Sequence, residues 1–313
     1  MIEAIIPIIY ISIFPGFIFL TIYSTLIQWL DRKLTAIMHN RVGPPIYQPI
    51  ADFIKLISKE VIIPENSDIL MFKSLPYIAI ASIIVSIIMI PVYSNNAIIS
   101  FSGDIIVVLY LLTIPTVTFF LAGWSSTSPY SLIGSMRVMT QLFGYEIPLF
   151  LSIAGPAILA GSWSISDIAK YFTEHPLMIL LNIPALIAAL LASCGKLERV
   201  PFDAPHAKNE VVGGQFTEYS GRLLALFLLS IDIEMVVIAA LINAVFLGGV
   251  FNLTGIAGFI MFLIKTLFVC LIFILLKVAM ARVRVDQLIK FSWKYLVPLS
   301  IIQILINIYI KLN

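Results

Sequence analysis

Ionisable side chains lie within stretches of the sequence that are otherwise apolar, and these residues could carry chemistry. Asp232 and Glu234 lie in one apolar run, and Lys265 lies in the next. An ionisable group at the centre of a bilayer costs about 2.5–3.5 kcal/mol on insertion scales, so such groups usually face a bundle interior or water. They therefore indicate a proton relay, with a structural ion pair, such as Glu234 with a lysine of a neighbouring span, as the alternative.

A second set of polar side chains recurs at helical spacing. Arg137, Gln141 and Tyr145 are separated by four residues each, and Glu146 follows directly. Residues four apart lie on the same face of a helix. The pattern predicts a polar helix face and makes Glu146 a candidate for the same relay, with an ion pair again as the alternative.

A loop between two apolar runs, at about 195–220, is rich in acidic residues. Glu198, Asp203, Glu210 and Glu218 lie among prolines and glycines that fix the backbone, which predicts an ordered acidic lining. Asp203 and Glu210 would share a face if this stretch is helical. Within the same run, His206 could join a proton path, although an isolated loop histidine is more often solvated.

The composition sets the class of protein. Of 313 residues, 60% are hydrophobic and 12% are charged, with a mean hydropathy of +1.05. A soluble domain carries about 25% charged residues, so this chain cannot cover a soluble surface. Its net charge of +2 does not suit nucleic-acid binding. Its two cysteines, Cys194 and Cys270, match no zinc spacing and cannot ligate an iron–sulfur cluster alone. We therefore expect an all-α integral membrane protein.

Eight membrane spans are expected, because a helix needs about 20 apolar residues to cross the hydrocarbon core. The start of the chain lacks a basic segment, which predicts a first span rather than a cleaved signal peptide. We expect one polytopic domain over residues 1–313. Its spans are predicted at about 4–30, 74–93, 104–122, 137–160, 175–194, 221–249, 255–280 and 293–311.

Lysine and arginine are concentrated in alternate loops, which sets the expected orientation. The other loops hold only Lys170, and Lys311 lies at the C-terminus. Loops rich in Lys and Arg remain in the cytoplasm. The pattern predicts a multi-pass cell-membrane protein with its N-terminus outside and with four cytoplasmic loops, at 31–73, 123–136, 195–220 and 281–292.

The first of these loops contains an expected amphipathic helix at about 48–60. Ile50, Phe53, Ile54 and Ile57 recur at helical spacing after the Gly43-Pro44-Pro45 break, with polar residues on the other side. The helix is too short and too polar to span a membrane. It is either a helix on the lipid surface or a platform on which a soluble partner docks.

Several strings resemble the membrane subunit of respiratory complex I that contacts the hydrophilic arm, called the H subunit in bacteria and subunit 1 in mitochondria. That family has E-R-K, R-x-G-P and Q-P-x-x-D-x-x-K-L-x-x-K-E near its first span. The likeness extends in the same order over almost the whole chain. The matching positions are Arg32-Lys33, Arg41, Gly43-Pro44, Gln48-Pro49, Asp52, Lys55-Leu56, Lys59-Glu60, Gly123 to Ser126, Arg137, Gln141, Tyr145 to Pro148, Pro201 to Asp203, Pro205, Glu210, Gly213, Glu218 to Gly221, Arg282, Arg284, Asp286 to Leu288 and Trp293-Lys294.

The resemblance implies two groups of functional residues. One is an acidic chain from the electron-transfer module into the membrane, and the other is a face that meets partner subunits. The expected proton path comprises Glu146, Asp203, Glu210 and Glu218, extended by Asp232, Glu234, Tyr145, His206 and Lys265. The expected partner-facing residues are Arg32, Lys33, Arg41, Gln48, Asp52, Lys55, Arg137, Arg199, Arg282, Arg284 and Asp286.

Departures from the family pattern favour one of its branches. Only three residues, Pro45 to Tyr47, separate Pro44 from Gln48, where quinone-reducing members have a longer, glycine-rich segment. The compact form is similar to the membrane-bound [NiFe] hydrogenase branch, which uses no quinone. Asp31 replaces a family glutamate, and the segment Pro205 to Lys208 replaces the family's Pro-Glu-x-Glu. Ile231 stands where the family has a glutamate, and in this chain Asp232 and Glu234 lie beside that position.

These features predict a membrane-anchor and coupling subunit that is not catalytic alone and binds no metal or other cofactor itself. We expect the [NiFe] centre and iron–sulfur clusters in partners, namely a hydrogenase-like large subunit and a small iron–sulfur subunit. Antiporter-like membrane subunits and lipid are further expected partners. One alternative is the H subunit of a quinone-reducing NADH dehydrogenase-type complex. A stand-alone ion transporter is another, although no internal repeat is visible.

Overall fold

The computed structural model describes residues 9–312 and is 74% helical, with no strand among them. Residues 4–8 of the expected first span, the first residues of the chain, the last residue and the side chains of Lys208 and Asn209 lie outside what it describes. Seven described helices are long and apolar enough to span a membrane. The expected all-α integral membrane protein is thereby confirmed. These helices cover Ile9–Met38, Ile69–Ile88, Asp104–Ser125, Pro129–Ala160, Gly221–Phe246, Gly255–Ala279 and Val285–Leu312.

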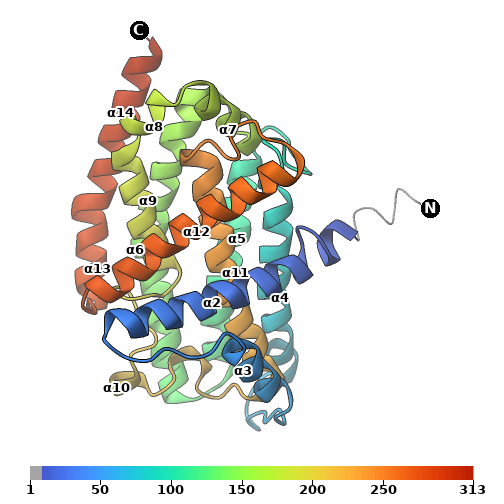
Figure 1. The fold of residues 1–313 in the computed structure, drawn as a ribbon. Helices are drawn as coiled ribbons and strands as arrows, with labels where there is room; N and C mark the ends of the chain where they lie inside the picture. The colour runs from blue at the N-terminus through green and yellow to red at the C-terminus, as the bar shows by residue number, and fades with distance from the viewer. Residues whose placement is uncertain (1–8, 313) are drawn as a thin grey trace.

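The long helices form one bundle around α11 (Gly221–Phe246), whose second half is almost entirely buried. α4 (Ile69–Ile88), α5 (Asp104–Ser125) and α6 (Pro129–Ala160) pack in sequence along one side of it. α2 (Phe17–Met38) and α12 (Gly255–Ala279) contact each other and run obliquely across α11 (Figure 1). The acidic residues Asp232 and Glu234 of α11 are therefore surrounded by other helices and by the loops at one end.

The expected fifth span, 175–194, is two shorter helices, α8 (Leu177–Leu181) and α9 (Ile183–Lys196). The break falls at Asn182, since Pro184 has no amide hydrogen to continue the ladder. Gln303 compensates by donating to the Leu181 carbonyl oxygen over 2.9 Å, and Asn307 donates to the Asn182 side chain over 2.9 Å. Neighbouring helices can thus satisfy a helix break inside a membrane.

Two expected boundaries were wrong. The fourth span was expected to begin at residue 137 and the last at 293, but α6 begins at Pro129 and the last helix begins at Val285. In α6 the extra turns are polar because they pack against protein. Ser131 donates to the Gln215 carbonyl oxygen over 3.0 Å, and a Cβ at Gly134 would lie 2.6 Å from the Gln215 nitrogen. The last helix consists of α13 (Val285–Phe291), the π-helical η2 (Ser292–Leu296) and α14 (Val297–Leu312).

The polar connections gather at one end of the bundle, here called the loop end. It contains α3 (Gln48–Ile57), α10 (Lys208–Val211), the short 3-10 helix η1 (Gly214–Phe216) and the start of α13, whereas α7 (Ile165–Glu174) and α8 lie at the other end (Figure 1). The amphipathic helix is confirmed. Ile50, Ile54 and Ile57 are exposed, so this face of α3 is accessible either to lipid or to a docked partner, while Phe53 packs against the core.

Candidate functional site

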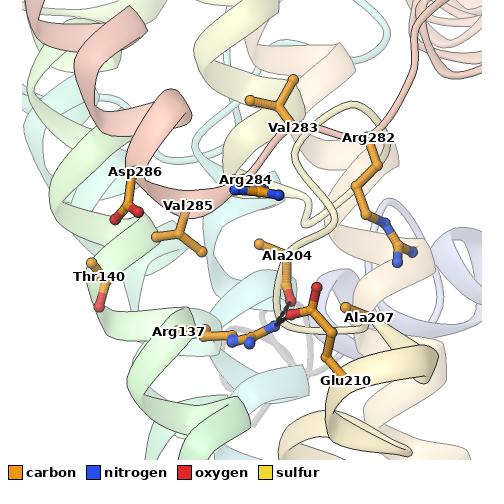
Figure 2. Close-up of a pocket in the computed structure, with 10 residues that line it drawn as sticks. All are labelled: Arg137, Thr140, Ala204, Ala207, Glu210, Arg282, Val283, Arg284, Val285 and Asp286. Carbon is orange, nitrogen blue, oxygen red and sulfur yellow. Dashed lines mark hydrogen bonds and ion pairs between the residues drawn. The ribbon is translucent and has the colours of Figure 1, made fainter.

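A cavity of about 630 Å³ opens at the loop end between α6, the 197–220 loop and the link from α12 to α13. Three arginines face it from these elements (Figure 2), and it is here called the arginine cavity. Its lining residues are Arg137, Thr140, Ala204, Ala207, Glu210, Arg282, Val283, Arg284, Val285 and Asp286.

Two of the three arginines are paired with acids of the 197–220 loop. Arg137 contacts Glu210 at 2.5 Å and also donates to the Ala204 carbonyl oxygen over 3.4 Å (Figure 2). Arg282 pairs with Asp203, whose side chain is 16% exposed. Asp203 lies outside the short helix α10 that carries Glu210, so the two acids do not share a helix face, and they hold the loop against two different elements.

Asp203 also connects the arginine cavity to a second cluster of polar side chains, which consists of His206, Glu198 and Gln215. His206 Nε2 lies 2.9 Å from Glu198 Oε2, and Gln215 donates to the same oxygen over 2.9 Å. Burial raises the pKa of Asp203, and the nearby charges of His206 and Arg282 oppose that rise. Burial alone would lower the pKa of His206, but its hydrogen bond to Glu198 and the charges of Glu198 and Asp203 outweigh burial and raise it. His206 is therefore held toward its protonated form.

Deeper in the bundle, Lys196 and Glu234 form an ion pair at 3.3 Å, with each side chain 1% exposed. Lys196 also donates to the Leu112 carbonyl oxygen, and its ammonium lies 5.7 Å from the centre of the Tyr145 ring. The Tyr145 hydroxyl bonds Thr116 over 3.1 Å. The ion pair weighed as the alternative for Glu234 is thus present, and its partner is the last residue of α9 rather than a lysine of α12.

Asp232 lies in a separate buried cluster that joins α2, α11, α12 and the start of the 197–220 loop. Arg199 contacts Asp31 at 2.7 Å and Asp232 at 3.5 Å. Asp31 also accepts two hydrogen bonds of 2.9 Å from Lys277, and Gln28 donates to Asp232. Arg199, expected on the partner-facing surface, is only 14% exposed and lies inside. Two acids and two bases of this cluster balance one another.

Of the other expected path residues, Glu146 follows Tyr145 on α6 and lies close enough to Lys196 for their charges to interact. No ion pair among the described residues links Glu218 or Lys265 to these groups. Glu146 is half-buried on α6, and Glu218 is half-buried without an ion pair to Arg222 or any other described residue. Lys265 lies at the opposite end of the bundle. There it donates to the Leu247 and Gly249 carbonyl oxygens, which terminates α11.

The remaining partner-facing candidates lie at the loop end. Arg32 pairs with Asp52 at 2.6 Å, and Gln48 donates to the same carboxylate over 3.0 Å. The hydrogen bond from Arg32 lowers the pKa of Asp52. Lys33 is half-buried beneath Gly43. The exposed members of the set are Arg41, Lys55, Arg282, Arg284 and Asp286.

The sequence does not predict the interior pairing of four charged residues. Lys196 is expected in a cytoplasmic loop, Glu198 in an acidic loop lining, Asp31 only as a replacement of a family glutamate, and Lys277, in the seventh apolar run, as a side chain that reaches the membrane surface. The available signal was charge balance, since each buried acid in an apolar chain requires a base nearby. No three His, Cys, Asp or Glu side chains converge as a metal site within residues 9–312.

Comparison with known proteins places this arrangement in a family. The model of the NADH dehydrogenase family matches residues 11–308. Two NADH-quinone oxidoreductase H subunits, from two strains of Dehalococcoides mccartyi, are 34% and 33% identical over 307 residues, covering 96% of this chain and 86% of theirs. A chain in the structure of the membrane-bound sulfane sulfur reductase, an archaeal respiratory membrane complex, is 27% identical with a TM-score of 0.81, covering 93% of this chain and 96% of that one. The resemblance carried by the loop motifs is confirmed, and the chain belongs to the NADH dehydrogenase family of membrane proteins.

Proposed function

We propose that this chain is the membrane-anchor and coupling subunit of a multi-subunit, complex I-like oxidoreductase of the membrane-bound hydrogenase type. Electron transfer in a hydrophilic arm docked at the loop end is linked through this chain to movement of protons or sodium ions. In this proposal the loop end faces the cytoplasm. A hydrogenase-like large subunit and a small iron–sulfur subunit carry the [NiFe] and iron–sulfur centres, and antiporter-like subunits lie beside the chain in the membrane.

The observation that carries the proposal is a series of ionisable groups leading from the arginine cavity into the bundle. Asp203 faces Arg282 on the cavity side and interacts with His206 on the inner side. His206 contacts Glu198, and the next buried charges are Lys196 and Glu234. Each step alternates an acid with a base, so a proton added at one position changes the charge felt by the next.

The series has an outer part, Asp203, His206 and Glu198, and an inner part, Lys196 and Glu234. Buried oxygen atoms that could accept a hydrogen bond lie in the same region. The Oε1 atoms of Gln141, Glu198 and Gln215 accept no hydrogen bond from the described residues. Gln141 donates to the Gly195 and Phe202 carbonyl oxygens, which places it beside the segment that carries Lys196 and Glu198. Buried acceptors of this kind are ordinarily satisfied by internal water. We infer that water joins Glu198 to the Lys196–Glu234 pair.

The compact Pro45 to Tyr47 segment favours the hydrogenase branch over a quinone-reducing complex. Trp29 donates to the Pro44 carbonyl oxygen over 3.2 Å, and a Cβ at Gly43 would lie 2.6 Å from Lys33 Cδ. This packing keeps the segment close to α2. The relatives named as H subunits of NADH-quinone oxidoreductase support the quinone-reducing alternative, and the likeness to a sulfane sulfur reductase chain favours a sulfur species as a second candidate acceptor.

The test compares Glu234→Gln with wild type in the complete complex, purified in detergent and reconstituted into vesicles. We expect the variant complex to lose most ion uptake per electron transferred, or to stop turning over, because the amide cannot exchange a proton. Since Glu234→Gln also leaves Lys196 without its counter-charge, the double variant Lys196→Met/Glu234→Gln, in which no buried charge is unpaired, covers the case in which Glu234→Gln alone fails to assemble. Glu174→Gln, at an exposed glutamate of α7, is the matched control and keeps the wild-type ratio. A wild-type ratio in Glu234→Gln would remove Glu234 from the path.

A second measurement separates the branches. Copurified partners are identified by mass spectrometry. A large subunit with nickel-binding Cys-x-x-Cys pairs supports the hydrogenase assignment, whereas bound quinone or inhibition by quinone-site ligands supports the alternative. Recovery of the chain as an isolated, transport-competent monomer would contradict both.

A further inference from the structure

The arginine cavity contains one guanidinium whose charge is not balanced within the described chain. Arg137 is paired with Glu210, and Arg282 is paired with Asp203. No carboxylate among residues 9–312 lies within ion-pair distance of Arg284, and Figure 2 shows its side chain across the cavity from the Arg137–Glu210 pair. Arg284 is therefore the positive charge available to a ligand.

One acidic residue in the cavity is likewise without a described base. Asp286 lies at the opposite edge from Arg282, beside Thr140 (Figure 2). Its charge would repel a ligand that is negative throughout, such as the phosphate of an anionic headgroup. A peptide segment can present a carboxylate to Arg284 and a basic group to Asp286, so the two available charges fit a protein ligand better.

An apolar groove of about 370 Å³ adjoins the cavity. Val283 lines both, so the groove and the cavity lie on either side of this residue in the α12–α13 link. The groove is formed largely by apolar side chains, with Gln287 at its edge. Its lining residues are Pro201, Phe202, Met280, Ala281, Val283, Gln287 and Phe291. A ligand that fills both spaces therefore has a charged part and an apolar part a few residues apart.

We propose that the arginine cavity and this groove receive a segment of a partner subunit that presents a carboxylate to Arg284 and a basic group to Asp286. A carboxylate of that segment pairs with Arg284, and an adjacent apolar side chain enters the groove beside Val283. The planar guanidinium and a carboxylate form two parallel hydrogen bonds, which fixes the orientation of the docked segment. The inference rests on the proposed function only in requiring that the chain has a docked partner.

Zero-length cross-linking in the intact complex tests the proposal. A carbodiimide joins a lysine amine to a carboxylate in direct contact but does not couple arginine. We expect Arg284→Lys to form a new cross-link from position 284 to an Asp or Glu of a partner subunit, identified by mass spectrometry. Arg222→Lys, at another exposed arginine of the loop end, is the matched control and gives no such product at position 222.

A second variant covers the case in which Arg284→Lys distorts the contact. Arg284→Gln should weaken retention of the docked subunit by about tenfold, measured as dissociation during salt washes, since a charge-assisted hydrogen bond is lost. Position 284 joined only to acids of this chain, or wild-type retention in Arg284→Gln, would overturn the proposal. Loss of bound phospholipid from Arg284→Gln, with the partner retained, would assign the cavity to a lipid and also overturn it.

These outcomes are independent of ion movement. The Glu234→Gln complex keeps an intact arginine cavity, so the cross-link at position 284 should form in an Arg284→Lys/Glu234→Gln double variant even where coupling is lost. A wild-type coupling ratio in Glu234→Gln together with a positive cross-link at position 284 contradicts only the function proposed above, whereas loss of coupling in Glu234→Gln without the cross-link in Arg284→Lys contradicts only the docking assignment.

Discussion

Lys196 and Glu234 meet at 3.3 Å in the interior of the bundle, on two helices that end and begin at the same side of it. Each side chain is almost completely removed from solvent. Removing one partner from such a pair leaves a buried charge without compensation, whereas removing both leaves none. The pair is therefore both a structural contact and a position at which gain of one proton changes the local charge by one unit.

Lys196→Met should destabilise the protein strongly. The ammonium is lost while the Glu234 carboxylate stays buried, and breaking a buried pair in this way costs about 3–5 kcal/mol. The measurement is thermal unfolding of the detergent-purified complex. The double variant Lys196→Met/Glu234→Gln should recover most of the loss, because no charge is then left unpaired. A double variant as unstable as Lys196→Met would show that packing, rather than charge, determines the effect.

The stability contributed by His206 should fall as pH rises. The folded-state pKa of His206 is raised, chiefly by Glu198 acting against burial. A raised pKa contributes stability that is complete below the unfolded value of about 6.5 and is lost as pH rises through the folded value. The difference in Tm between wild type and His206→Gln should therefore shrink from pH 6 upward. The control is His175→Gln at the opposite end of the bundle, and a difference that grows with pH would contradict the assignment.

Arg199→Gln should destabilise the protein more than Asp31→Asn. Arg199 serves both Asp31 and Asp232, so its loss leaves Asp232 with only the Gln28 amide as a described partner. Asp31→Asn leaves Arg199 paired with Asp232, and only Lys277 loses its carboxylate. Unfolding of the purified complex in denaturant measures both. Lys55→Gln, on the exposed side of α3, should have little effect.

Gln303→Leu should loosen the contact between α14 and the break in α9. The Leu181 carbonyl oxygen, in a part-buried position at the helix break, loses its donor, and an unsatisfied buried acceptor costs up to about 1–3 kcal/mol. Tm of the complex is the measurement, and Ile302→Leu, at an exposed neighbouring position, is the control. An unchanged Tm would indicate that another donor reaches Leu181.

The sequence predicts the long spans and the amphipathic helix, because the spans depend on continuous apolar runs of about 20 residues and the amphipathic helix on apolar residues at helical spacing. It does not predict the division at Asn182, where a run of ordinary hydrophobicity is interrupted by one proline whose effect depends on Gln303 in a distant helix. The same limit applies to the buried charges. Glu234 is recognisable from its position in α11, but its pairing with Lys196 depends on how α9 ends, which local periodicity does not specify.

The first residues of α6 show a second limit of prediction from sequence, because a buried helical segment there has the composition of a loop. Ser131, Gly134 and Ser135 are small or polar, as a loop would be, yet they are buried in a helix against η1. A Cβ at Gly134 would lie 2.6 Å from Gly214 C and the Gln215 nitrogen, so the small side chain is required by close approach of another segment. Composition alone cannot distinguish such a contact from solvent exposure.

Asp203 is shared between Arg282, which lines the arginine cavity, and His206, which belongs to the buried series. Any ligand that draws Arg282 away leaves the Asp203 charge to act on His206 alone and so strengthens proton binding there. Thermodynamic reciprocity requires the converse with the same free energy, so protonation of His206 must change the affinity of the cavity for that ligand. Through the Asp203 carboxylate, ligand binding in the arginine cavity and proton binding at His206 are thus thermodynamically coupled.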